Sequence, residues 1–224
     1  MRDTPTVLVE RLFIGSIRPL PPDGEPTGMF KQPVTGVRMV GPEGLIGDEQ
    51  ADRKHHGGPQ KALHHFPAEH YAAFALRWPE RAARMAPGVL GENLSTHGLT
   101  EADVCIGDVF AIGGCRIQIS QPRQPCWKIN HRLEAPDAVA FITESGRTGW
   151  YYRVVETGPI SAGDRLDLCE RPSPWLTLEH YWRTVTAHRP EPALLARIAE
   201  APGLAPDKAR RHAERAEWLR ANVR

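Results

Sequence analysis

The first three-quarters of the chain are divided into short apolar segments by glycine and proline. The 224 residues include 20 glycines and 21 prolines. Apolar segments recur at residues 7–17, 34–40, 89–94, 104–106, 109–112, 115–120, 151–156 and 165–170. Segments of this length suit strands rather than long helices, and the Gly113-Gly114 pair is typical of a hairpin turn. The pattern predicts a mainly β fold with some α, a closed or partly closed β-barrel with helical insertions.

Helical periodicity is confined to a few places. Residues 67–86 have apolar side chains at helical spacing, with Pro67 at the first turn. After residue 172 the apolar spacing predicts three helices in a row, separated by Pro190, Pro202 and Gly203. We therefore expect a β-barrel domain over residues 1–172 and a small three-helix C-terminal domain over residues 173–224.

Charge and hydropathy exclude several classes of protein. Lys and Arg total 28 and Asp and Glu total 27, so the net charge of +1 argues against a general binder of nucleic acid or anionic membrane. No apolar run approaches the ~20 residues of a spanning helix, and the first residues lack a secretion pattern. A cytoplasmic location is therefore expected. The three-helix segment carries nine basic and six acidic residues, which fits either an acidic partner or a solvated helix face.

Residues 121–127 contain the strongest candidate for chemistry. Cys126 directly follows Pro125 and lies three residues after Arg123. A stiff loop beside a fixed positive charge suits a reactive or metal-binding thiolate, although a small buried thiol in the core is the alternative. Two prolines remove hydrogen-bond donors, so this segment is not expected to form a central strand. The other three cysteines lie in apolar segments and are expected to be buried thiols.

A polar block between residues 47 and 66 is the second candidate. It contains two histidine pairs, at 55–56 and 64–65, and the Gly57-Gly58 pair. A glycine loop between a strand and a helix can turn backbone N–H groups toward an anion, although a simple turn has the same composition. A zinc site is the less favoured reading, because no HExxH pattern or cysteine partner accompanies the histidines. Asn93, at a strand end, suits either a ligand contact or a turn.

The order and spacing of five blocks resemble the MOSC domain family, and within it the YiiM-type bacterial proteins. The blocks are GDEQADRKHHGGPQKALHHFP at 47–67, GENLSTHGLTE at 91–101, GDVFAIGG at 107–114, QISQPRQPCWKIN at 118–130 and GRTGWYYRV at 146–154. The three-helix segment is similar to the helical extension of that subfamily. The resemblance implies a MOSC-type β-barrel and a molybdenum–pterin cofactor.

The resemblance also implies roles for individual residues. Cys126 matches the cysteine whose thiolate ligates molybdenum in related enzymes, and Arg123 would keep the sulfur ionised or hold the pterin phosphate. Asn93 would contact the pterin or the substrate. Further cofactor contacts are expected from the loop residues Arg53, Lys54, His56, Gly57 and Gly58.

The activity implied is the two-electron reduction of N-hydroxylated compounds, such as 6-hydroxylaminopurine-type base analogues. His56 or His65 would donate protons, because histidine titrates near neutral pH. The sequence has no flavin motif and no cluster-spaced cysteines, so electrons are expected from an external flavoprotein or iron–sulfur reductase. Two alternatives remain open: a non-catalytic carrier of cofactor or sulfur with a Cys126 persulfide, and a pyridoxal-phosphate enzyme using Lys61 or Lys128.

Overall fold

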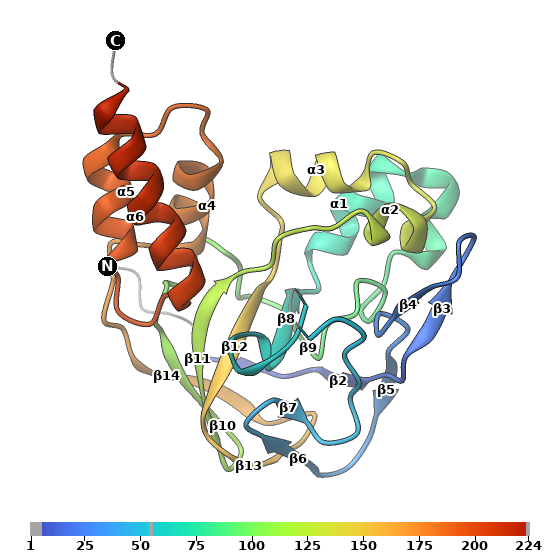
Figure 1. The fold of residues 1–224 in the computed structure, drawn as a ribbon. Helices are drawn as coiled ribbons and strands as arrows, with labels where there is room; N and C mark the ends of the chain where they lie inside the picture. The colour runs from blue at the N-terminus through green and yellow to red at the C-terminus, as the bar shows by residue number, and fades with distance from the viewer. Residues whose placement is uncertain (1–5, 54–55, 223–224) are drawn as a thin grey trace.

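A curled nine-stranded sheet dominates the computed structural model, which describes residues 6–53 and 56–222 (Figure 1). This architecture confirms the predicted mainly β fold with helices at the C-terminus. Across the sheet the strands run in the order β1 (Val7–Leu8), β14 (Arg165–Glu170), β10 (Val109–Ile112), β11 (Cys115–Pro122), β12 (Trp150–Glu156), β8 (Leu63–Pro67), β9 (Leu94–Thr96), β2 (Arg11–Ile14) and β5 (Gln32–Val34). All these pairs are antiparallel except β8 with β9.

One extended segment, residues 7–14, joins the two sides of the curled sheet. Its first part, β1, pairs with β14, and the Val9 N–H continues this contact by donating to the Asp164 carbonyl at 2.9 Å. Its second part changes partner, because the Glu10 N–H donates to the Ser95 carbonyl at 3.0 Å and β2 then pairs with β9. The segment thus brings β14 and β9 together and partly closes the barrel.

Smaller sheets and helices complete the fold. The strands are β3 (Arg18–Leu20) with β4 (Glu25–Thr27), and β13 (Gly158–Ile160) with β6 (Arg38–Gly41) and β7 (Gly44–Leu45). The helices are α1 (His70–Arg77), α2 (Lys128–Leu133), α3 (Ala138–Ser145), α4 (Leu178–Thr186), α5 (Pro192–Ala199) and α6 (Pro206–Ala221), with short 3-10 turns at Pro59–Lys61 and Pro79–Arg84. Figure 1 shows α1–α3 as one group and α4–α6 as another. The predicted three C-terminal helices are confirmed.

Two local predictions are wrong: the helix expected to start at Pro67, and the exclusion of residues 121–127 from a central strand. Residues 63–67 form strand β8, and Pro67 ends this strand instead of starting a helix, so α1 begins only at His70. All five residues of β8 are buried, because Leu63 packs in the barrel core on one face and Phe66 packs in the cluster that includes α1 on the other. Burial of both faces removes the alternation that would have revealed the strand. Strand β11 extends to Pro122, beyond a register shift between Ile119 and Gln121. Pro122 is its last residue, where a missing N–H is tolerated.

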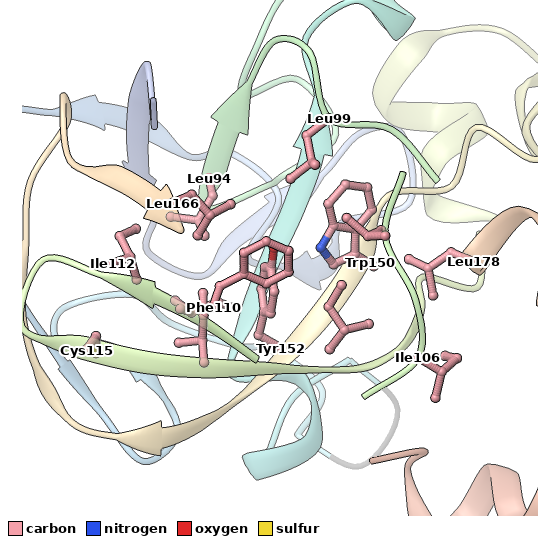
Figure 2. Packing of buried hydrophobic residues seen from close by; sticks show 14 of the residues in the cluster. Leu94, Leu99, Ile106, Phe110, Ile112, Cys115, Trp150, Tyr152, Leu166 and Leu178 are labelled. Atoms are coloured by element: carbon pink, nitrogen blue, oxygen red, sulfur yellow. The ribbon is translucent and has the colours of Figure 1, made fainter. Parts of the chain in front are cut away.

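Alternating side chains of the central strands fill the barrel. Trp150 and Tyr152 of β12, with Phe110 of β10, are fully buried and pack together in the core (Figure 2). Side chains from beyond residue 172 join the same cluster, among them Leu178 of α4 and Ile198 of α5. The barrel and the C-terminal helices therefore share one hydrophobic core. The domain boundary at residue 172 stays a prediction.

Within residues 6–53 and 56–222, no helix is long and apolar enough to cross a bilayer.

The shared core predicts that the barrel and the C-terminal helices unfold together. Ile198→Ala removes a fully buried side chain that packs with barrel residues, so it should lower the free energy of unfolding by roughly 2–5 kcal/mol. Calorimetry should give one transition that shifts as a whole. Leu76→Ala is the control, because this α1 side chain is 83% exposed and its loss should change stability by less than about 0.5 kcal/mol. A separate early transition would instead indicate independently folding helices.

Candidate functional site

Two cavities meet at a shared wall beside the end of β11. The inner cavity, of about 80 Å³, lies between residues 26–31, residues 49–52 with His56, and residues 90–93. The outer chamber, of about 620 Å³, lies between Arg53 with residues 56–61, the segment 121–126 and the start of α6. The side chains that line both are His56, Lys61, Cys126 and Tyr151. Segments far apart in the sequence thus contribute to one site.

The loop that carries Cys126 is held at both ends. At its start, the Arg123 N–H donates to the Gly149 carbonyl at 3.0 Å, which extends the β11–β12 pairing by one residue. At its end, the Cys126 carbonyl accepts the Ile129 N–H at 3.0 Å, at the start of α2. Arg123 is 6% exposed and lines the inner cavity, whereas Cys126 is half-buried and lines both cavities. The structure therefore brings Cys126, Arg123 and His56 together, as the sequence predicts.

Tyr151 is a site residue that sequence reasoning did not single out. Its neighbours in β12, Trp150 and Tyr152, point into the core, so the alternation of the strand turns Tyr151 toward the cavities. Burial raises the pKa of Tyr151, and the charge of Arg123 and a hydrogen bond with it oppose this only in part. Tyr151 therefore remains a protonated phenol that can donate a hydrogen bond at the site. The only signal was its place in a GWYYR block.

His56 lines both cavities, as expected of a proton donor, but its electrostatic surroundings disfavour protonation. Burial and then the positive charge of Arg123 lower the pKa of His56 to about 4, and Asp52 opposes this shift. In the ligand-free chain His56 is therefore a neutral imidazole at pH 7. It can accept a proton or exchange hydrogen bonds, and an anion bound nearby would be needed to make it a proton donor at neutral pH.

The structure separates the two histidines of β8. His65 is fully buried, with its ring nitrogens 3.0 Å from the Tyr152 hydroxyl and 2.8 Å from the Thr96 hydroxyl. It lines neither cavity, so the geometry gives no support to the proton-transfer role predicted for it. His64 lines the inner cavity instead, because successive strand residues face opposite sides, and its ring centroid lies 5.2 Å from that of Tyr151.

Asn93 lines the inner cavity, but its side chain also ties the surrounding segments together. Its amide nitrogen donates to Asp48 Oδ2 at 2.9 Å and to the Phe13 carbonyl at 3.2 Å, while its oxygen accepts the His64 N–H at 3.0 Å. Asp48 also pairs with the buried Lys31 at 2.5 Å. Both amide hydrogens of Asn93 are thus used within the protein, which leaves acceptor capacity alone for a ligand.

The glycine loop is held as a turn. The Gly58 N–H donates to Gln50 Oε1 at 3.1 Å, so this predicted anion donor is already used, and a Cβ on Gly57 would lie 2.1 Å from the same oxygen. Arg53 lines the outer chamber while forming an exposed ion pair with Glu43. Lys54, the remaining predicted contact of this loop, lies outside the described residues.

Two lysines complete the positive charge around the inner cavity. Lys61 and Lys128 both line it, and Lys128 Nζ donates to the Pro26 carbonyl at 2.7 Å. No observation favours either lysine as an aldehyde-binding group over its role as a fixed charge. Among the residues that the structure describes, no group of three or more His, Cys, Asp or Glu side chains is arranged to hold a metal ion.

Comparison with known proteins places this geometry in a family. Residues 52–167, which include the four residues that line both cavities, match the MOSC domain. Protein YiiM from Escherichia coli (strain K12) is 43% identical over 162 residues, which cover 72% of each chain. The chain belongs to the MOSC domain family. The family prediction made from the five sequence blocks is confirmed.

The similarity extends beyond the matched MOSC domain. The crystal structure of YiiM from Escherichia coli superposes with a TM-score of 0.76 at 32% identity, over 93% of this chain and 96% of that one. A protein named Reductase from Gibberella moniliformis (strain M3125 / FGSC 7600) is 34% identical over 177 residues. That match covers 79% of this chain but 31% of the longer relative, so most of the relative lies outside it.

Burial of His65 predicts how stability depends on pH. Burial lowers its pKa from 6.5 to about 3, so the unfolded chain takes up the proton first as the pH falls. Stability is then full above pH 6.5 and is lost as the pH falls from 6.5 toward 3, by about 2 kcal/mol at pH 5 from this residue. Urea unfolding measures the decrease in the free energy of unfolding between pH 7.5 and pH 5. This decrease should be about 2 kcal/mol smaller in His65→Gln than in the unchanged chain. An equal loss in both proteins would contradict this assignment.

Proposed function

We propose that this chain is a molybdenum-cofactor-dependent reductase of N-hydroxylated compounds, in which the Cys126 thiolate is the molybdenum ligand. The net reaction is R–NHOH + 2H⁺ + 2e⁻ → R–NH₂ + H₂O. The observation that carries the proposal is the half-buried Cys126 thiol on the wall between two cavities, beside the buried Arg123. Membership of the MOSC family and a relative named Reductase support the oxidoreductase class.

The donor set at this wall fits the cofactor. Molybdenum takes soft sulfur ligands, and Cys126 is the cysteine that lines the cavities. Cys105 and Cys115 are buried in apolar surroundings that raise the pKa of each thiol, to about 11 for Cys105, and Cys169 is exposed on β14. Arg123, Lys61 and Lys128 add the positive charge that an anionic pterin phosphate needs.

The residues that line the cavities have different roles in the proposed reaction. Arg123 keeps a fixed positive charge beside the thiol, and the Tyr151 hydroxyl can orient a substrate nitrogen or oxygen by hydrogen bonding. A bound anion raises the pKa of His56 from about 4, so that its imidazolium can supply a proton to the departing hydroxyl. A bound molybdenum cofactor would supply the two-electron centre that the reduction needs. Electrons come from an external flavoprotein or iron–sulfur reductase.

Metal content tests the ligand assignment. Chain produced in a cofactor-competent host should contain about one molybdenum per chain, and Cys126→Ala should lose both the metal and the reductase activity. Cys169→Ala is the matched control, because this exposed thiol lies on β14 outside both cavities, and it should keep both properties. Near-stoichiometric molybdenum in the Cys126→Ala protein would refute the assignment.

A second measurement distinguishes a catalytic reductase from a non-catalytic carrier of cofactor or sulfur. Anaerobic incubation of the loaded chain with a chemical reductant and 6-hydroxylaminopurine should yield the amine over many turnovers. A carrier would instead transfer sulfur from a Cys126 persulfide and leave the hydroxylamine unchanged. That outcome would overturn the reductase proposal while leaving Cys126 as the reactive residue.

A further inference from the structure

Besides Lys61, which the proposed function already uses, the outer chamber contains charged side chains that have no part in the proposed reaction. Basic residues from two distant parts of the chain line it together with one acidic residue, Asp207. The basic residues are Arg53, Lys61, Lys208 and Arg211. Lys208 and Arg211 come from α6, which lies about 150 positions beyond the glycine loop. This excess of positive charge is local, since the whole chain has a net charge of only +1.

The charges of the chamber oppose one another in the absence of a ligand. Burial lowers the pKa of Lys208, the negative charge of Asp207 opposes this shift, and the positive charges of Arg211 and Lys61 add to it. Grouping like charges in a partly buried chamber is unfavourable unless an anion neutralises them. The chamber therefore favours a negatively charged occupant.

An unpaired donor on the same wall also points to a ligand. Gln121 lines the chamber and is 2% exposed, and its side-chain amide nitrogen has no hydrogen-bond partner among the residues that the structure describes. A buried N–H group without a partner costs free energy comparable to a lost hydrogen bond. An acceptor oxygen within the chamber would remove that cost.

The start of α6 is fixed against the barrel at this point. The Ala205 N–H donates to the Ser120 carbonyl of β11 at 3.0 Å, and the Arg153 guanidinium donates to the Gly203 carbonyl at 2.8 Å. Lys208 Nζ lies 3.4 Å from Gln124 Oε1, within the loop that carries Cys126. The start of α6 thus lies against β11, the strand that leads to the candidate metal ligand (Figure 1).

We propose that the outer chamber is a phosphate-monoester subsite, completed by Lys208 and Arg211 of the C-terminal helix. Lys61 and the Gln121 amide contribute from the barrel side, and the positive end of the 16-residue helix α6 adds to the attraction. The phosphate group belongs either to the pterin cofactor or to a nucleotide form of the substrate. Binding of phosphate stands independently of the proposed reductase activity, and only the molecule that brings it rests on that proposal.

Calorimetric titration of the full cofactor-free chain tests the subsite. Inorganic phosphate and adenosine monophosphate should bind, and adenosine, which lacks the phosphate, should bind at least tenfold more weakly than the monophosphate. The double variant Lys208→Ala/Arg211→Ala should weaken binding of both phosphate ligands at least tenfold. Arg210→Ala is the matched control, because Arg210 lies on the same helix, pairs with Glu214 and is not in the chamber. It should bind like the unchanged chain.

Two further measurements check that the variants fold and identify the molecule that brings the phosphate. Thermal unfolding without ligand identifies a misfolded variant, and Lys208→Gln/Arg211→Gln then replaces it as a test that keeps the side-chain stems. Repeating the titration on the cofactor-loaded chain assigns the source: lost phosphate binding indicates the cofactor's own phosphate, and retained binding indicates the substrate's. Absence of binding by the unchanged chain at millimolar phosphate, or equal affinity in the double variant, would overturn the subsite whatever the reductase assay gives.

Discussion

The antiparallel pair of β11 and β12 is the constraint on which both the core and the candidate site depend. Alternate residues of this pair, such as Ile117, Ile119 and Trp150, fill the barrel. A register shift beyond Ile119 then changes the course of β11, and the next residues lead out of the core toward the cavities. Tyr151 faces the site from the partner strand. The same hydrogen bonds that hold the sheet therefore set the positions of Arg123 and Cys126.

Local patterns predicted the hairpin strands well and failed for strands defined by distant neighbours. Strands β10 and β11 are joined by Gly113-Gly114, a turn whose geometry follows from two adjacent residues. Strand β8 has polar histidines, no alternation and a proline at its end, and it is a strand because β12 and β9 pair with its two edges. That partnership depends on residues about 30 and 90 positions away, which no short window of sequence includes.

The residues of the candidate site also fall into two groups, those that local sequence predicts and those whose position depends on distant parts of the chain. Cys126 and Arg123 lie three residues apart on one stiff loop, so their proximity could be predicted from the sequence. Whether His64 or His65 reaches the cavity depends on which face of β8 meets the core, and a shift of one residue reverses the answer. Lys208 enters the site only because the start of α6 is hydrogen-bonded to β11. The helical spacing of the residues in α6, taken alone, would place Lys208 on a solvent-exposed face.

The change of partner within residues 7–14 has a consequence for how the chain is made. Thr6 hydrogen-bonds to Asp167, 161 positions further along, and the strand that follows Thr6 completes the barrel between β14 and β9. On the ribosome, residues 7–14 emerge long before their partner on β14 has been synthesised. Closure must wait for nearly the whole barrel to be translated, and such distant pairing is slow to form. Residues 7–14 are thus translated before their partners and are among the last to take their place in the barrel.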